Sequence, residues 1–167
     1  MVYRHIAGVH VTADFSGDRK YRYRLEVRKA ATGTAGRTVC VIMQNPSYAD
    51  GEVADRSVQF MEKIVFLRGL PEFAGVGRLI VVNLFAYIQT HGFVPSREKI
   101  GPCNDQAIEA AIREADIVVL AWGSAKSLSW RESEVRSLLK ICPGKILLKT
   151  KAHPSRGRYT GFIAEIR

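Results

Sequence analysis

Four short apolar runs, rich in Val, Ile and Leu, dominate the pattern of the chain; they are residues 39–43, 79–85, 117–122 and 146–150. Strands of a parallel sheet that is covered on both faces have this composition. Between these runs lie stretches with apolar residues at helical spacing, namely residues 57–68, 105–115 and 130–141. This alternation predicts an α/β fold, a three-layer α/β/α sandwich around a four-stranded parallel central sheet.

The N-terminal part of the chain alternates apolar and polar positions instead. Residues 2–12 and 21–28 both show this alternation, which is typical of half-buried strands. The second of these runs places its charged side chains together on an outer face, namely Arg22, Arg24, Glu26 and Arg28. We predict an N-terminal β-hairpin extension over residues 1–38 and an α/β core over residues 39–167, within a single domain.

The composition excludes several classes of protein. The chain has 167 residues, of which 47% are hydrophobic, so it can form one domain with a full core and is not expected to be disordered. No stretch approaches the roughly 18 apolar residues of a membrane span, and the start has no apolar signal segment. Three widely spaced cysteines argue against a disulfide framework and a four-thiolate metal site. We expect a cytoplasmic monomer without metal or cofactor.

The formal net charge of +9 is distributed unevenly along the chain. Residues 1–38 carry a net +5, residues 39–122 a net −3 and residues 123–167 a net +7. If the two basic ends meet in space, they form one face that binds phosphates; otherwise they are two solvated ends. The charge alone permits a nucleic-acid partner without deciding between these alternatives.

Polar and aromatic side chains gather where the four apolar runs end. They are Gln44, Asn45, Tyr48 and Asp50 after the first run, Asn83 near the end of the second, Trp122 at the end of the third, and His153, Ser155, Arg156, Arg158 and Tyr159 after the fourth. Ligands of parallel α/β sheets bind just beyond the carboxyl ends of the strands. The sequence therefore predicts a binding site on this rim.

Most of these residues also have a purely structural interpretation. The Asn45 segment is an ordinary turn signal, and Asp50 and Asp55 are suitable helix caps. Asn83 sits inside an apolar run, where a buried amide either binds a ligand or ties down a neighbouring loop, since leaving it unpaired costs about 1–3 kcal/mol. Phe60 is either a core residue or a stacking platform.

Taken together, four segments resemble the motifs of the uracil-DNA glycosylase superfamily. The resemblance covers residues 39–159. The matching segments are Met43-Gln44-Asn45-Pro46, Val82-Asn83, Ala121-Trp122-Gly123 and His153-Pro154-Ser155-Arg156. The chain also resembles small bacterial and phage proteins with an uncharacterised domain that bears Asn-Pro-Ser-x-Ala-Asp, which residues 45–50 fit. The first resemblance implies a metal-free enzyme that acts on a base flipped out of DNA.

The resemblance implies a role for each matching residue. Asn45, or Asp50 nearby, would position a water and stabilise the positive sugar, and His153 would donate to the departing base. Residues implied to bind the base are Gln44, Tyr48, Phe60 and Asn83. Residues implied to bind DNA or to fill the gap left by the base are Lys151, Ser155, Arg156, Arg158 and Tyr159. The residue that activates water stays open among Asn45, Asp50 and Asp55.

Departures from the family pattern affect the expected substrate. Met43 replaces a glycine of the first motif, Asn45 replaces the carboxylate of the fastest members, and Gly157 lies where an intercalating leucine is expected. We therefore expect a monofunctional DNA glycosylase for a modified pyrimidine, such as a phage-type modified cytosine removed in antiphage defence, or for uracil. The alternatives are a non-catalytic nucleic-acid-binding module on the same fold and a small-molecule nucleoside hydrolase.

Overall fold

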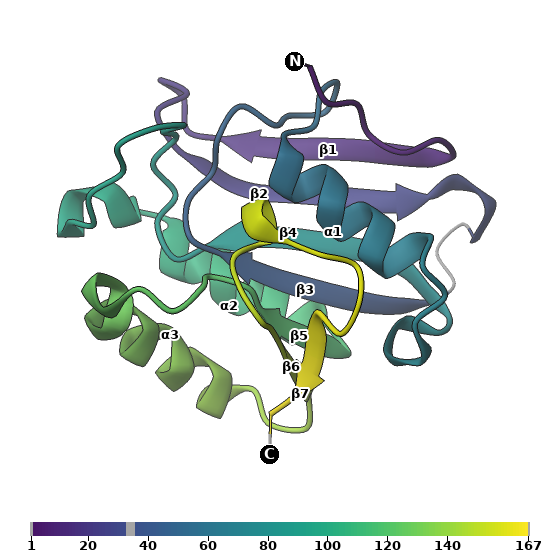
Figure 1. The fold of residues 1–167 in the computed structure, drawn as a ribbon. Helices are drawn as coiled ribbons and strands as arrows, with labels where there is room; N and C mark the ends of the chain where they lie inside the picture. Colours follow the sequence, from purple (N-terminus) through teal and green to yellow (C-terminus); the bar gives the residue numbers. More distant parts are fainter. Residues whose placement is uncertain (1, 33–35, 167) are drawn as a thin grey trace.

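The computed structural model describes residues 2–32 and 36–166, which form one seven-stranded sheet in the order β1-β2-β4-β3-β5-β6-β7 (Figure 1). The strands are β1 (Val9–Phe15), β2 (Arg22–Lys29), β3 (Arg37–Met43), β4 (Val76–Asn83), β5 (Ile117–Leu120), β6 (Ile146–Thr150) and β7 (Ile163–Glu165). The α-helices of the described part are α1 (Arg56–Phe66), α2 (Asn104–Glu114) and α3 (Ser129–Ile141). None of them is long and apolar enough to cross a membrane.

The prediction of a four-stranded parallel central sheet in a three-layer sandwich was wrong, because the sheet is larger and mixed. The four apolar runs form β3, β4, β5 and β6, which pair in parallel. The hairpin β1–β2 continues the same sheet through an antiparallel pairing of β2 with β4, and β7 adds an antiparallel strand at the opposite edge. The hairpin therefore extends the sheet at one edge, and its first strand begins at Val9 rather than residue 2.

Both faces of the central strands are buried, as their apolar composition requires. Helix α1 covers one face through Val58, Met61 and Ile64, which pack with Leu25 and other residues of the strands. Helices α2 and α3 cover the other face, where Ile108 and its neighbours form a second apolar cluster. In Figure 1, α1 lies in front of the sheet and α2 behind it.

A β-bulge in the hairpin changes the direction of one charged side chain. In the pairing of β1 with β2, Asp14 lies opposite Arg24 and Phe15 lies opposite Arg22, so Tyr23 has no partner in the register. A bulge interrupts the alternation of side chains and re-aims the residue beside it. Arg24 pairs with Glu114 of α2, whereas Arg22 is buried on the opposite side of the sheet. The predicted placement of Arg22 on the charged outer face was therefore wrong.

Candidate functional site

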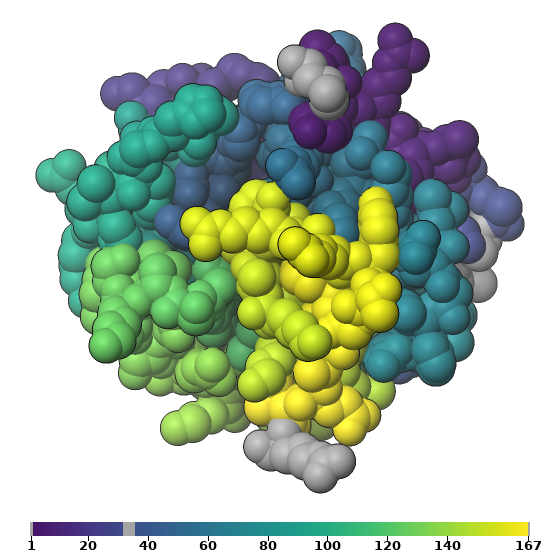
Figure 2. Space-filling model, in the orientation of Figure 1, coloured from purple at the N-terminus to yellow at the C-terminus, as the bar shows by residue number. Residues whose placement is uncertain are grey.

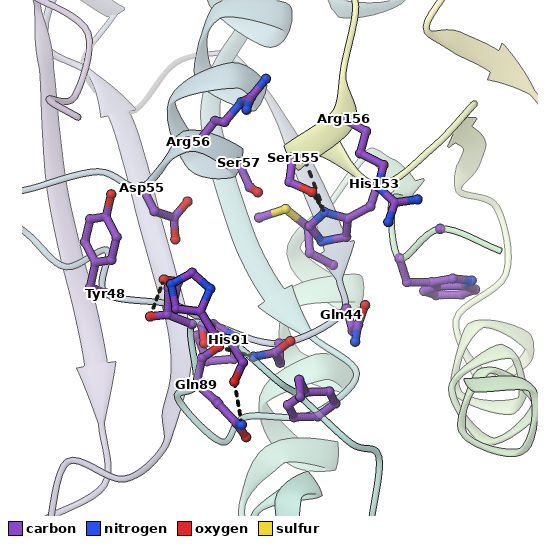
Figure 3. Close-up of a pocket in the computed structure, with 18 of the residues that line it drawn as sticks. Gln44, Tyr48, Asp55, Arg56, Ser57, Gln89, His91, His153, Ser155 and Arg156 are labelled. Atoms are coloured by element: carbon purple, nitrogen blue, oxygen red, sulfur yellow. Dashed lines mark hydrogen bonds between the residues drawn. The ribbon is translucent and has the colours of Figure 1, made fainter. Parts of the chain in front are cut away.

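A cavity of about 890 Å³ lies beyond the carboxyl ends of β3, β5 and β6 (Figure 3). Its walls come from the segments that follow these strands, the first turn of α1, and a stretch of the loop after β4. They are residues 43–48, 122–125, 152–153, 155–156, 55–57 and 89–93. Tyr3 and Arg22 complete the lining. The cavity therefore lies at the edge of the sheet where the sequence predicts a binding site, because parallel strands bring their carboxyl ends to one side.

The structure brings together half of the predicted site residues. Those that line the cavity are Gln44, Asn45, Tyr48, His153, Ser155 and Arg156. Those that lie outside its lining are Asp50, Phe60, Asn83, Lys151, Arg158 and Tyr159.

The imidazole of His153 has a defined proton arrangement. Its Nδ1 accepts a hydrogen bond from the backbone N–H of Ser155 at 3.2 Å and lies 2.9 Å from the Ser155 hydroxyl. Because a backbone N–H can only donate, Nδ1 carries the lone pair, and the neutral ring holds its proton on Nε2. Among the described residues, no hydrogen-bond partner of Nε2 is found.

The surroundings of His153 favour its neutral form. Burial lowers the pKa of the imidazole, the carboxylate of Asp55 opposes this shift, and the positive charge of Arg156 adds to it. The net direction is downward from the ordinary value. At neutral pH, His153 is therefore an uncharged donor.

Asp55, and not Asp50, provides the carboxylate of the cavity. Asp55 caps α1, and its Oδ1 accepts from the backbone N–H of Val58 at 2.8 Å. The side chain is buried, and Figure 3 shows it pointing into the same space as His153, with Ser57 between them in this view. Asp50 lies outside the lining, where its Oδ1 accepts from the backbone N–H groups of Glu52 and Val53, which lower its pKa.

Asn45 connects the turn after β3 to the opposite wall. Its Nδ2 donates to the backbone carbonyls of Pro46 and Gln89, the latter at 2.8 Å. Within the described residues its Oδ1 has no partner, so the free end of the amide is an acceptor. The loop between β4 and α2, whose role the sequence leaves open, is held by this contact and by the Ser47–Thr90 hydroxyl pair.

Asn83 ends β4 beneath the cavity and is 1% exposed. Its Oδ1 accepts from Arg22 Nη2 at 3.4 Å, and its backbone carbonyl accepts from Asn104. Arg22 lines the cavity and Asn83 does not. Of the two interpretations that the sequence allows for Asn83, the contacts favour the structural one, in which the amide supports a neighbouring group.

Phe60 is a packing residue of α1 rather than part of the cavity. Its ring stacks on Tyr159 and meets Phe162 edge-on, with both centroids at 5.0 Å. Tyr159 also lies under the guanidinium of Arg68. These contacts fix the segment after His153 against α1, and Figure 2 shows this yellow segment on the surface beside the blue and teal residues of the first half of the chain.

The sequence misses several residues at the mouth and floor of the cavity. Arg56, the first residue of α1, is exposed beside Asp55, and Arg156 is exposed across the opening from it. Tyr48 is 44% exposed at the same opening. Arg56 directly follows a capping Asp, and this position could have indicated that it lies at the cavity. The apolar–polar alternation of β2 contains no signal that Arg22 lines the cavity. Among the described residues, no group of three or more His, Cys, Asp or Glu side chains could hold a metal ion.

Gly157 provides a test of the packing that fixes the His153 segment. A Cβ at this position would lie 2.4 Å from the ring of Phe60, closer than packed atoms allow. We predict that Gly157→Ala lowers the free energy of unfolding by about 1–3 kcal/mol, measured by urea denaturation. Gly17→Ala is the control, since its Cβ would meet nothing within 4 Å and is expected to change stability by less than about 0.5 kcal/mol. Equal stability of the two variants would contradict the packing role.

Comparisons with known proteins identify a family but no activity. A search of curated proteins and a search of solved structures each gave no match. The sequence profile of a family described as a protein of unknown function, DUF1643, matches residues 22–155, which include the cavity-lining residues Arg22 and His153. Because this match covers most of the chain, the protein belongs to the DUF1643 family.

Proposed function

We propose that this protein is a DNA glycosylase that takes a flipped base into the cavity and hydrolyses its N-glycosidic bond. The observation that carries the proposal is that a buried carboxylate, Asp55, and an imidazole donor, His153, line the same cavity. The proposed substrate is a modified pyrimidine or uracil in DNA. The cavity volume of about 890 Å³ is within the range of sites that enclose a small molecule, which is roughly 300–1,000 Å³.

Asp55 acts on the sugar side of the reaction in this proposal. Cleavage of an N-glycosidic bond passes through a positively charged, oxocarbenium-like sugar. The carboxylate of Asp55 stabilises this charge, and its Oδ2 is free to orient the attacking water because the cap contact uses Oδ1. Asn45 presents a second acceptor, its Oδ1, to the same water.

His153 acts on the base side of the reaction. Negative charge grows on the departing base, so a donor placed there acts mainly in the transition state. The Nε2–H of the neutral ring is such a donor, and the contact of Nδ1 with the Ser155 backbone N–H holds the ring in this tautomer. His153 keeps its proton, since a neutral hydrogen-bond donor is sufficient to stabilise the leaving oxygen. The base leaves as an anion and is protonated by solvent, and the attacking water gives up its proton to the carboxylate of Asp55 as its oxygen bonds to the sugar.

The mouth of the cavity supports DNA, rather than a free nucleoside, as the substrate. Arg56 and Arg156 flank the opening as two exposed cations, and Tyr48 offers an aromatic face between the cavity and solvent. Guanidinium groups bind phosphates on either side of a flipped nucleotide, and an exposed aromatic ring stacks on a base.

The first prediction concerns formation of abasic sites. Purified protein incubated with DNA that contains uracil, a mismatch or a phage-type modified cytosine is expected to yield strand breaks after alkali. Asp55→Asn and His153→Gln are each expected to lower the rate by about 10²–10³-fold. The matched control is Asp50→Asn, which changes a carboxylate outside the cavity. No breaks in any DNA would contradict the proposal, and hydrolysis of free nucleosides alone would assign the cavity to a nucleoside hydrolase.

The second prediction concerns pH. Because burial lowers the pKa of His153, the neutral donor is present at neutral pH, and activity is lost as pH falls through this lowered pKa, below the ordinary value of about 6.5. Protonation of Nδ1 would also break its contact with the Ser155 N–H. The measurement is the pH profile of the single-turnover rate. His153→Gln is expected to remove this acidic limb, and an unchanged limb in that variant would contradict the role of His153.

The third prediction concerns salt. Arg56→Ala and Arg156→Ala are each expected to weaken DNA binding and to reduce the slope of log K against log salt by about 1, because each removes one phosphate contact. Fluorescence anisotropy at several salt concentrations measures this slope. Arg113→Ala is the control, since Arg113 lies on α2 and pairs with Glu109. A slope equal to that of the control would show that the two arginines do not contact phosphate.

A further inference from the structure

Arg22 occupies the floor of the cavity, although it comes from the hairpin and not from a strand end. The guanidinium is 1% exposed and lines the cavity together with Met43 and Gln44. Its Nη1 donates to the carbonyl of Ala49 at 2.9 Å, and its Nη2 contacts Asn83 Oδ1. The bulge at Tyr23 turns the side chain to this position. A flipped base entering past Tyr48 would reach Arg22 with the edge opposite its sugar.

The hydrogen-bonding capacity of Arg22 is only partly used. Guanidinium has five N–H donors, and Nε has no acceptor among the described residues. Arg22 also forms no salt bridge within the described part of the chain; Asp55 and Asp50 act on it only at longer range. Burial lowers its pKa to about 10, so it is still a cation at neutral pH. A buried cation without a paired carboxylate is costly, and an acceptor supplied by a ligand relieves this cost.

Asn83 holds the guanidinium of Arg22 in this position, although it does not itself line the cavity. Guanidinium can only donate, so the carbonyl end of the amide must face Arg22, which fixes the orientation of Asn83. Its Nδ2 is buried and has no partner among the described residues. Of these two side chains Arg22 lines the cavity, and there it has an unpaired N–H group and no acceptor. A ligand edge with an oxygen acceptor complements this arrangement, whereas an amino group would set donor against donor.

We infer that Arg22 determines base specificity by binding an oxygen acceptor on the edge of the base that lies farthest from the sugar. This inference rests on the proposed function and names its substrate class. Two kinds of pyrimidine have such an oxygen. One has a carbonyl at C4, as in uracil, and the other is a cytosine whose C5 substituent carries a hydroxyl or sugar, so that this oxygen, and not the C4 amino group, faces Arg22. Unmodified cytosine, with an amino group at C4, is excluded from the floor.

The test measures binding apart from catalysis. The probes are short DNA strands with one central nucleotide whose sugar carries 2′-fluorine, which disfavours the oxocarbenium state and leaves the base attached. The central base is uracil, cytosine or 5-hydroxymethylcytosine. Nitrogen-15 NMR follows the Nε–H resonance of Arg22. We expect uracil or 5-hydroxymethylcytosine to shift this resonance and to bind at least about tenfold more tightly than cytosine. A response to uracil identifies the oxygen as the C4 carbonyl, and a response to 5-hydroxymethylcytosine identifies it as the hydroxyl at C5.

Two lysine variants separate specificity from folding. Arg22→Lys keeps the charge but loses the planar donor array, so the affinity ratio between the preferred base and cytosine is expected to fall about tenfold. Arg24→Lys is the matched control on the same strand, because Arg24 pairs with Glu114 on the other face of the sheet. In this variant the affinity ratio between the preferred base and cytosine is expected to stay unchanged. If Arg22→Lys does not fold, the NMR titration of the unaltered protein still decides.

The outcomes for this inference and for the proposed function are distinct. Equal affinity for the three bases, or an Arg22 resonance that none of them shifts, overturns the role of Arg22 even if abasic sites form. A base-specific shift without any abasic site in cleavable DNA supports the donor floor and overturns the glycosylase proposal. An unchanged affinity ratio in folded Arg22→Lys also overturns the inference.

Discussion

The burial of β3 on both faces is the constraint on which the structure depends. Six of its seven residues are buried, and the strand pairs in parallel with β4 on one side and β5 on the other. Parallel neighbours require crossover connections, which here include the helices on the two faces. Since the carboxyl ends of these strands meet at one edge, the polar segments that follow them line a common cavity.

A second constraint is the contact between Phe60 and the segment after β6. Gly157 lies beside the ring and leaves no space there for a Cβ, and Tyr159 and Phe162 pack against the ring. This packing brings the segment of His153 to the N-terminal turn of α1, where Asp55 caps the helix. The two groups to which we assign the chemistry are therefore held by a helix cap and an aromatic cluster, neither of which belongs to the strands themselves.

The sequence predicted part of the site because some of its signals are local. The residues directly after a buried strand must lie at its carboxyl end, so Gln44, Asn45 and His153 follow from strand assignment alone. Asp50 and Asp55 could not be separated in this way. They lie five positions apart in one connection, and only its folded path shows that Asp50 closes a turn while Asp55 faces the cavity.

The sequence by itself determined the apolar strands, the three helices, the edge of the sheet that carries the cavity, and the place of His153 in its lining, because each depends on side-chain pattern along a short stretch. Only the tertiary structure decided that the hairpin joins the same sheet and that Arg22 forms the floor of the cavity. The physical reason is the register. Tyr23 has no partner in the pairing of β1 with β2, and this bulge changes the side of the sheet on which the side chain of Arg22 lies. The apolar–polar alternation within one strand does not show how that strand pairs with its neighbour.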